Sequence, residues 1–215
     1  MRHLMTTAAG WTGAVVRAIR PDQFGNPTPC ANYDVRTLVN HLFHWGASYA
    51  ERAARKAAPP PGGPDDDRTG RPDWAEEFAR QAELAARAWS APEAWTGTSH
   101  LAGRPMPAEL VGSLLSVELV LHGWDLAVAT GQPTRCPPEL ASATLDIVTR
   151  VADHARANGA FGDAVPVAES APPLSRALAL SGRDPDWSPG RPGTAAAPVG
   201  QLTSSAQARQ SSSTP

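Results

Sequence analysis

The sequence predicts an all-α protein: a four-helix bundle with one additional helix. Apolar residues recur at helical spacing in five separate segments, and no stretch shows the strict alternation typical of half-buried strands. Gly- and Pro-rich stretches separate these segments and supply the stop signals that helices need. The length of 215 residues suits a single domain.

The first two predicted helices precede a polar linker. One runs from about Leu4 to Ile19 and ends before Pro21, because a residue that precedes proline disfavours the helical region. Asp34 is a suitable N-cap for the second helix, which is expected to continue to about Ala57. Its buried face is predicted from apolar residues at helical spacing, namely Val35, Leu38, Val39, Leu42 and Tyr49.

Three further helices follow. Residues 58–72 contain a Pro-Gly cluster and three consecutive aspartates, so we expect a solvated linker there. The apolar spacing then predicts a third helix over about 73–90, an irregular connection over 91–107, a fourth helix over about 107–130 and a fifth over about 139–158.

The C-terminal part is poorer in helical pattern. Residues 161–187 hold several prolines and are expected to wrap around the bundle in an extended conformation. From residue 188 onward Pro, Gly, Ala, Ser and Gln prevail, and few apolar side chains remain to offset the entropy of ordering. We therefore predict one helical domain over 1–187 and a disordered tail over 188–215.

Bulk properties narrow the function classes. A formal net charge of −2 and a pI near 6.3 give no electrostatic footprint for nucleic acid. The one long apolar run, at 110–128, is interrupted by three ionisable residues, so we expect no membrane span. Two cysteines without a CxxC motif and no signal-peptide pattern at the N-terminus indicate the reducing cytoplasm. The oligomeric state is not predicted.

The apolar fourth helix carries the most informative polar residues. Glu118, His122 and Asp125 are its only ionisable side chains between residues 110 and 128. Burial of a charge is costly unless the group is paired, hydrogen-bonded or bound to a metal. Glu118 and His122 lie four residues apart, on one helix face, and together suit a divalent cation that would need a third ligand from elsewhere.

His41, at the edge of the apolar face of the second helix, is the best donor of that third ligand. Two plainer interpretations stay open at this point. A histidine at the edge of an apolar face is usually a satisfied core residue, and a Glu-His pair four residues apart can be a simple hydrogen bond. Facing helices of a bundle would bring His41 to Glu118 and His122, where bundles commonly build metal sites.

Other residues are weaker candidates. Asp125 either orients a metal-ligating histidine or forms a hydrogen bond to a neighbouring helix or to Arg36. Cys30 is a possible reactive thiol or fourth ligand, but no predicted helix aims it at the site. His44 and His100 are expected at the surface, although His100 could approach the mouth of the site; Trp45 and Trp124 could wall a pocket.

Three separated motifs resemble actinobacterial DinB-like metal-binding proteins. Segments 28–41 and 118–127 are similar to the motifs of the second and fourth helices of that family. Segments 161–167, 171–174 and 182–187 resemble the closing part of one uncharacterised branch. The best-understood relative is mycothiol-dependent maleylpyruvate isomerase, whose N-terminal domain has this bundle.

The resemblance implies a DinB-like bundle that holds a divalent metal, zinc by default, on His41, Glu118 and His122. The remaining coordination position would be open to water or to a thiol cofactor, mycothiol. In one respect the chain departs from this relative: the isomerase has a second, C-terminal domain that contributes to its substrate site, whereas only about 25 ordered-looking residues follow the fifth helix here.

The leading hypothesis is a metal-dependent enzyme that uses mycothiol for S-transfer to, or isomerisation of, a small electrophilic substrate. A metal-dependent hydrolase and a metal-stabilised binding protein without turnover are the alternatives. Whether the chain is an enzyme is left open. A further alternative is a bundle whose polar residues form hydrogen bonds only with one another and which binds no metal.

Overall fold

The computed structural model gives the structure of residues 2–61, 63 and 66–190. Most of this part is helical: α1 (Arg2–Arg17), α2 (Val35–Leu42), α3 (Ala50–Ala54), α4 (Trp74–Ser90), α5 (Ala108–Ala129), α6 (Pro138–Ala157) and α7 (Pro173–Leu180). Two short 3-10 turns, η1 (Pro21–Gln23) and η3 (Pro92–Trp95), and a π-helical segment, η2 (Phe43–Tyr49), complete the helical part.

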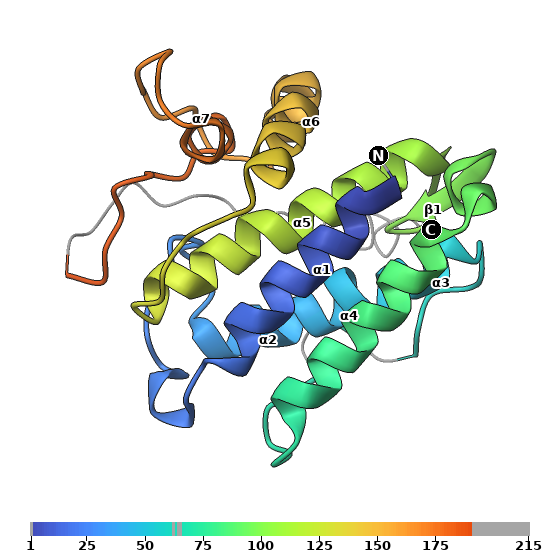
Figure 1. The fold of residues 1–215 in the computed structure, drawn as a ribbon, viewed down its shortest axis with the longest axis horizontal. Coiled ribbons are helices and arrows are strands. Elements are labelled where there is room, and N and C mark those ends of the chain that lie inside the picture. The colour runs from blue at the N-terminus through green and yellow to red at the C-terminus, as the bar shows by residue number, and fades with distance from the viewer. Residues whose placement is uncertain (1, 62, 64–65, 191–215) are drawn as a thin grey trace, which may run out of the picture.

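The bundle is built from α1, the run α2–η2–α3, α4 and α5 (Figure 1). α1 packs against both α4 and α5, while the continuous run α2–η2–α3 packs against α4 and α5. α6 contacts α5 and α1, and α7 packs on α6 on the side away from α4. The predicted all-α bundle with an additional helix is therefore confirmed.

α5 is the core helix of this arrangement. By length and composition it could cross a membrane, yet 89% of its most apolar 18-residue window is buried within the protein. A helix that is apolar all round suits the centre of a bundle as well as a bilayer, and burial by its neighbours distinguishes the two. The structure favours the core helix.

The second predicted helix is not a regular α-helix. It changes to π geometry at Phe43 and returns to α geometry at Ala50. Gly46, inside the π segment, lies so close to α5 that a Cβ atom at this position would be 2.7 Å from Leu119 Cδ2. Single π turns inside α-helices occur often beside functional sites, and this one begins two residues after His41.

The predicted irregular connection over 91–107 is more ordered than expected. Strands β1 (Thr98–Leu101) and β2 (Arg104–Pro107) form an antiparallel hairpin, joined by Ala102 and Gly103 at φ values of 50° and 76°. This geometry is that of a two-residue hairpin turn, which strongly prefers Asn-Gly. The sequence signal was weak because alanine occupies the first position.

The closing segment 161–187 was predicted to be extended, and this is wrong for its middle part, which forms α7. Pro173 is the first residue of this helix, a position where the missing N–H of proline costs nothing.

The linker 58–72 is mostly exposed, as predicted, but Asp67 connects it to α2 by accepting hydrogen bonds from Arg36 and Asn40. Residues 191–215 of the predicted tail lie outside the described residues.

Candidate metal centre

Two neighbouring helices bring the three predicted ligands together. Asp34 caps α2, its carboxylate accepting the N–H of Thr37 at 2.8 Å, and this start places His41 on the buried side that faces α5. Glu118 and His122 lie one turn apart in the middle of α5. Because α2 packs against α5, side chains from sequence positions 77 residues apart meet in the core.

The ligand atoms of His41, Glu118 and His122 all lie within 4.8 Å of one another. Glu118 Oε1 is 2.5 Å from His41 Nε2 and 3.4 Å from His122 Nε2. The two imidazole rings are nearly perpendicular, with centroids 5.1 Å apart. All three residues are at most 5% exposed.

A second set of contacts fixes the ring of His122. Its Nδ1 lies 2.8 Å from Asp125 Oδ2, and Arg183 donates from Nε to Asp125 Oδ1 and from Nη2 to Oδ2, each at 2.9 Å. Asp125 and Arg183 are fully buried. Burial alone would raise the pKa of Asp125, but the Arg183 guanidinium and the His122 ring outweigh it and hold that pKa below its usual value.

The ionised Asp125 therefore accepts the Nδ1–H of His122, which leaves the lone pair of this histidine on Nε2. Burial lowers the pKa of His122 despite the nearby carboxylates, so the neutral ring is favoured. A neutral imidazole with one nitrogen held by a carboxylate is the form that ligates metals in proteins. Asp125 thus contacts His122, as the first sequence interpretation required, whereas its other partner is Arg183, which lies outside the helices, and not Arg36 or a neighbouring helix.

His41 has its own partner on the other side. The hydroxyl of Tyr33, in the loop before α2, lies 3.3 Å from His41 Nδ1, and the two rings are 5.1 Å apart. With Nδ1 directed at Tyr33, Nε2 faces Glu118. Both histidines are therefore held from outside the cluster and direct their Nε2 atoms inward.

The cluster meets a chemical test for a cation. His122 Nε2 is a buried nitrogen without a hydrogen-bond partner among the described residues, and such atoms are rare in native proteins. Burial would raise the pKa of Glu118, but His122 and His41 outweigh it and favour the carboxylate. Since Arg183 balances Asp125, Glu118 is the remaining buried acidic side chain among the residues that the structure describes.

The spacing also agrees with first-row metal ligation. Ligand atoms about 2.1 Å from a tetrahedral ion lie about 3.4 Å from each other. The separation of His122 Nε2 from Glu118 Oε1 equals this value, whereas the shorter 2.5 Å contact of His41 is a direct hydrogen bond. The residues present thus fit a divalent metal after a small movement of His41 or Glu118.

Cys30 lies closer to the cluster than the sequence indicated. Its Sγ groups with a ring nitrogen of His122 and a carboxylate oxygen of Asp125 within 4.8 Å, although no helix carries it. Burial first, and then Asp125, raise the pKa of this thiol to about 12. We therefore prefer the His41, Glu118 and His122 set, because Cys30 stays protonated and Asp125 is already held by Arg183.

The other candidates do not join the site. Arg36 pairs with Asp67 at 3.2 Å and lies over the Phe24 ring. His100 is exposed, as predicted, and lines a separate cavity beside α3, whereas His44 is half-buried. Trp124 is buried in the core and Trp45 is half-buried.

Sequence reasoning missed Arg183 and Tyr33. Arg183 lies 58 residues after Asp125, and in a chain in which nearly all basic residues are arginine its residue type gives no signal. Its place in the closing motif 182–187 was the one indication available. Tyr33 lies within the motif 28–41, but only the fold shows which histidine it contacts.

The candidate ligands are almost completely buried. A cavity of about 220 Å³ beside α3 and another of about 520 Å³ between α1 and α6 contain none of the three residues. Entry of a substrate-sized molecule to the cluster would require movement of the side chains around it.

Fold and site together define a helical bundle with two histidines and one carboxylate facing each other in its core. The chain belongs to the family described as the mycothiol maleylpyruvate isomerase N-terminal domain, whose family model matches residues 5–127. Two uncharacterized proteins from strains of Mycobacterium tuberculosis are 31% identical to the chain over 173 residues, which cover 79% of this chain and 90% of each relative.

A solved structure supports the fold assignment. The crystal structure of a mutant of mycothiol-dependent maleylpyruvate isomerase matches with a TM-score of 0.52 and 14% sequence identity. The match covers 76% of this chain and 72% of that chain. At this identity the likeness concerns the fold alone.

Proposed function

We propose that this protein is a divalent-metal-dependent enzyme that uses a low-molecular-weight thiol, mycothiol, on a small electrophilic substrate. His41, Glu118 and His122 would hold the metal, with zinc as the default for two histidines and one carboxylate. The observation that carries the proposal is the unpartnered, buried His122 Nε2 beside Glu118 and His41. Family membership supports the thiol.

A divalent metal with an open position would lower the pKa of a coordinated thiol and so supply a nucleophile at neutral pH. The protein's residues prepare that position. Asp125 and Tyr33 hold the two rings with Nε2 directed inward, and Glu118 offers a carboxylate oxygen between them. S-transfer and thiol-assisted isomerisation would both draw on this arrangement.

Hydrolysis is less well supported. Activation of water needs a nearby general base. Asp125 is the nearest further carboxylate in the described residues, and its two oxygens are held by Arg183 and His122.

A second candidate function follows from the burial of the three candidate ligands. Because the three ligands are at most 5% exposed, a metal there could stabilise a binding protein that has no turnover. In that case metal removal would lower the melting temperature strongly while thiol and electrophile screens gave no product. Product formation that requires both metal and mycothiol would exclude this alternative.

The first test is elemental analysis of purified, tag-free protein beside His41→Ala and Glu118→Ala. We expect about one equivalent of metal in the wild type and loss in both variants at unchanged helicity. Wild type that stays empty after incubation with zinc and desalting would overturn the proposal.

Both cysteines are unpaired, which supports a reducing compartment, and we propose a cytoplasmic location.

A further inference from the structure

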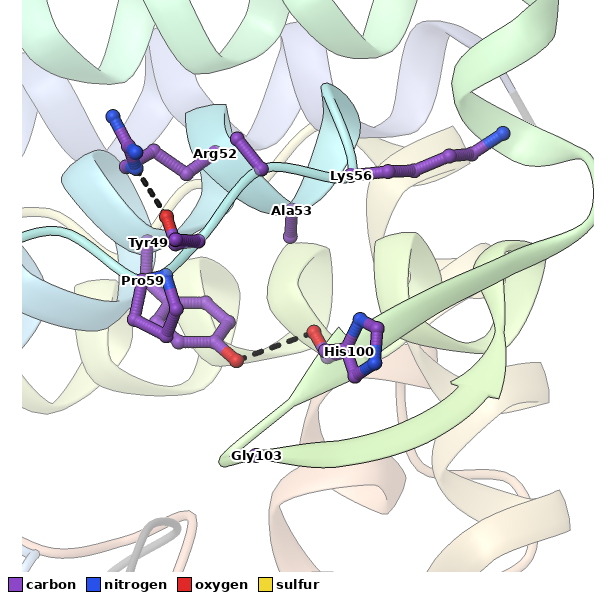
Figure 2. Close-up of a pocket in the computed structure, with 9 residues that line it drawn as sticks. Tyr49, Arg52, Ala53, Lys56, Pro59, His100 and Gly103 are labelled. Atoms are coloured by element: carbon purple, nitrogen blue, oxygen red, sulfur yellow. Dashed lines mark hydrogen bonds between the residues drawn. The ribbon is translucent and has the colours of Figure 1, made fainter.

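A small cavity with a basic rim lies between α3 and the β1–β2 hairpin (Figure 2). Its volume is about 220 Å³, below the range of about 300–1,000 Å³ that holds drug-sized ligands. Such a cavity suits a small molecule or one end of a longer one. Its lining residues are Tyr49, Arg52, Ala53, Lys56, Ala57, Ala58, Pro59, His100 and Gly103.

The described side chains that line the cavity include basic residues and no acidic one. Arg52, Lys56 and His100 are its ionisable basic residues, and no acidic side chain of the described residues lines it. No salt bridge joins Arg52 to a carboxylate in this part of the chain, whereas its neighbour Arg55 pairs with Glu51. Arg104, next to Gly103, adds a further exposed positive charge at the hairpin.

Arg52 is the group best placed to receive an anion. Its Nε donates to the carbonyl of Ala58, which fixes the side chain, and its two terminal nitrogens have no hydrogen bond within the described residues. Lys56 is committed elsewhere: its side chain leads away from Tyr49 in Figure 2, and Nζ donates to the carbonyl of Glu93 at 3.1 Å. A fixed guanidinium with free N–H groups matches the planar geometry of a carboxylate.

The remaining walls are apolar. The apolar lining residues are Ala53, Ala57, Ala58 and Pro59, and the Tyr49 hydroxyl donates to the carbonyl of His100 at 3.3 Å. Tyr49 is 4% exposed, so it lines the cavity as a buried side chain. A single guanidinium group beside apolar side chains fits an organic acid better than an inorganic ion.

One feature favours a single negative charge over a phosphate. The C-terminal end of α3 reaches the cavity, and its partial negative charge opposes a doubly charged phosphate more strongly than a singly charged carboxylate.

Backbone strain is concentrated at the same place. Lys56 and Ala102, at φ values of 54° and 50°, are the two non-glycine residues with positive φ in the described part of the chain. Lys56 lines the cavity and Ala102 precedes Gly103, which also lines it. Residues held in sparsely populated conformations cluster at ligand sites, where surrounding structure maintains them.

We propose that this cavity binds the carboxylate of a small organic acid, with Arg52 as the anion-binding residue and Tyr49 and Pro59 against the apolar part. The site contains none of the candidate metal ligands. His41 and Tyr49 lie eight residues apart in one helical run, about 12 Å along its axis. Binding here is therefore testable without metal.

The test is an NMR titration of the full chain with benzoate, followed through backbone amide shifts. We expect saturable shifts confined to residues 49–59 and 100–104, and at least about tenfold weaker binding in Arg52→Gln. Arg52→Lys keeps the positive charge but lacks the planar guanidinium, so it should bind benzoate more tightly than Arg52→Gln and more weakly than the wild type. Arg176→Gln, an exposed arginine on α7, and His41→Ala should bind as the wild type does.

Four results would overturn the proposal: no saturable shifts at these residues, equal binding of benzyl alcohol, tighter binding of inorganic phosphate, or unchanged affinity in folded Arg52→Gln. Failure of the metal proposal leaves this test unaffected, because benzoate binding is measured in the absence of metal. The two proposals can thus fail separately.

Discussion

At the scale of single residues, Asp125 connects the candidate metal centre to the closing segment. Its carboxylate accepts hydrogen bonds from His122 on one side and from Arg183 on the other. Removal of its charge would free the His122 ring to rotate or change tautomer. The consequences for metal binding and for stability are separable, since they depend on different partners.

Asp125→Asn should lower metal affinity about tenfold or more, because the ring of His122 would lose the carboxylate that fixes its tautomer. Competition with a chromophoric chelator measures this affinity. Asp153→Asn is the matched control, since Asp153 is fully exposed on α6 and pairs only with Arg156 in the described structure. Unchanged affinity in Asp125→Asn would remove this residue from the site.

Arg183→Met should destabilise the metal-free protein by about 3–5 kcal/mol, because it leaves the buried Asp125 carboxylate without its cation. The double variant with Asp125→Asn should recover a large part of that loss, since neither charge then remains buried. Urea unfolding of the two single variants and the double variant gives the coupling free energy. Additive losses would show that the pair is not energetically coupled.

The sequence could predict His41, Glu118 and His122 because helical spacing and apolar context are local properties. Their approach to one another in the structure agrees with that prediction, while metal binding by them stays a prediction. Arg183 could not be found in the same way. Its partner lies 58 residues away, and only the packing of the closing segment onto α5 brings the two together.

At the scale of elements, close packing between α4, α5 and η3 depends on Gly112. A Cβ atom there would lie 2.6 Å from Trp89 Cζ3 and 2.9 Å from Trp95 Cζ3. The Trp89 ring cannot easily move aside, because its Nε1 donates to the carbonyl of Ala50 at 2.8 Å. The glycine therefore sets the distance between these elements.

Gly112→Ala should destabilise the protein by about 1–3 kcal/mol through overpacking. Gly10→Ala is the matched control, because Gly10 lies in α1 with open space around it and should gain up to about 1 kcal/mol from helix propensity. Urea unfolding at neutral pH measures both changes. A neutral Gly112→Ala would mean that the indole rings shift at little cost.

The linker gives a prediction that depends on pH. Asp67 accepts hydrogen bonds from Thr69, Asn40 and Arg36, and the Thr69 hydroxyl is the largest cause that lowers its pKa, from 3.8 to about 2. A carboxyl with a lowered pKa in the folded state stabilises the protein above its unfolded pKa. This contribution is lost as pH falls from about 4 toward 2.

Asp67→Asn should therefore cost about 0.5–1 kcal/mol at pH 7, a modest value because the side chain is half exposed. The difference from wild type should shrink between pH 4 and pH 3. Urea unfolding at pH 7, 4 and 3 tests this, with the exposed Asp22→Asn as control. A difference that stays constant down to pH 3 would contradict the assignment.

The predicted element boundaries failed where turn chemistry was unusual. The hairpin at 98–107 was missed because alanine holds the turn position that normally carries asparagine, and α7 was missed because Pro172 and Pro173 suggested extended chain. The π segment could not be predicted, since its sequence differs little from an α-helix and Gly46 matters only against Leu119.

At the scale of the whole molecule, metal binding and stability should be linked. The candidate ligands come from α2 and α5, so an ion that binds them joins two helices that are far apart in sequence. A ligand that binds only the folded state, at a concentration of 100 times its Kd, adds about 2.7 kcal/mol to the free energy of unfolding.

Fold class was the most predictable property because apolar periodicity repeats in every helix.

Zinc at this excess should raise the Tm by about 5–10 °C, since 1 kcal/mol shifts a domain of this size by about 2–4 °C. Chelation should reverse the shift. His41→Ala and Glu118→Ala should show little response to zinc. A response in these variants equal to that of the wild type would place the ion elsewhere.

The bond between Asp125 and Arg183 also bears on how such chains evolve. The family match ends at residue 127, so it includes Asp125 and omits Arg183. A fragment trimmed to the match would keep a buried acid and discard the base that neutralises it. Substitutions at the two positions should consequently be inherited together, and lineages that lost the closing segment should have replaced Asp125 with an uncharged residue.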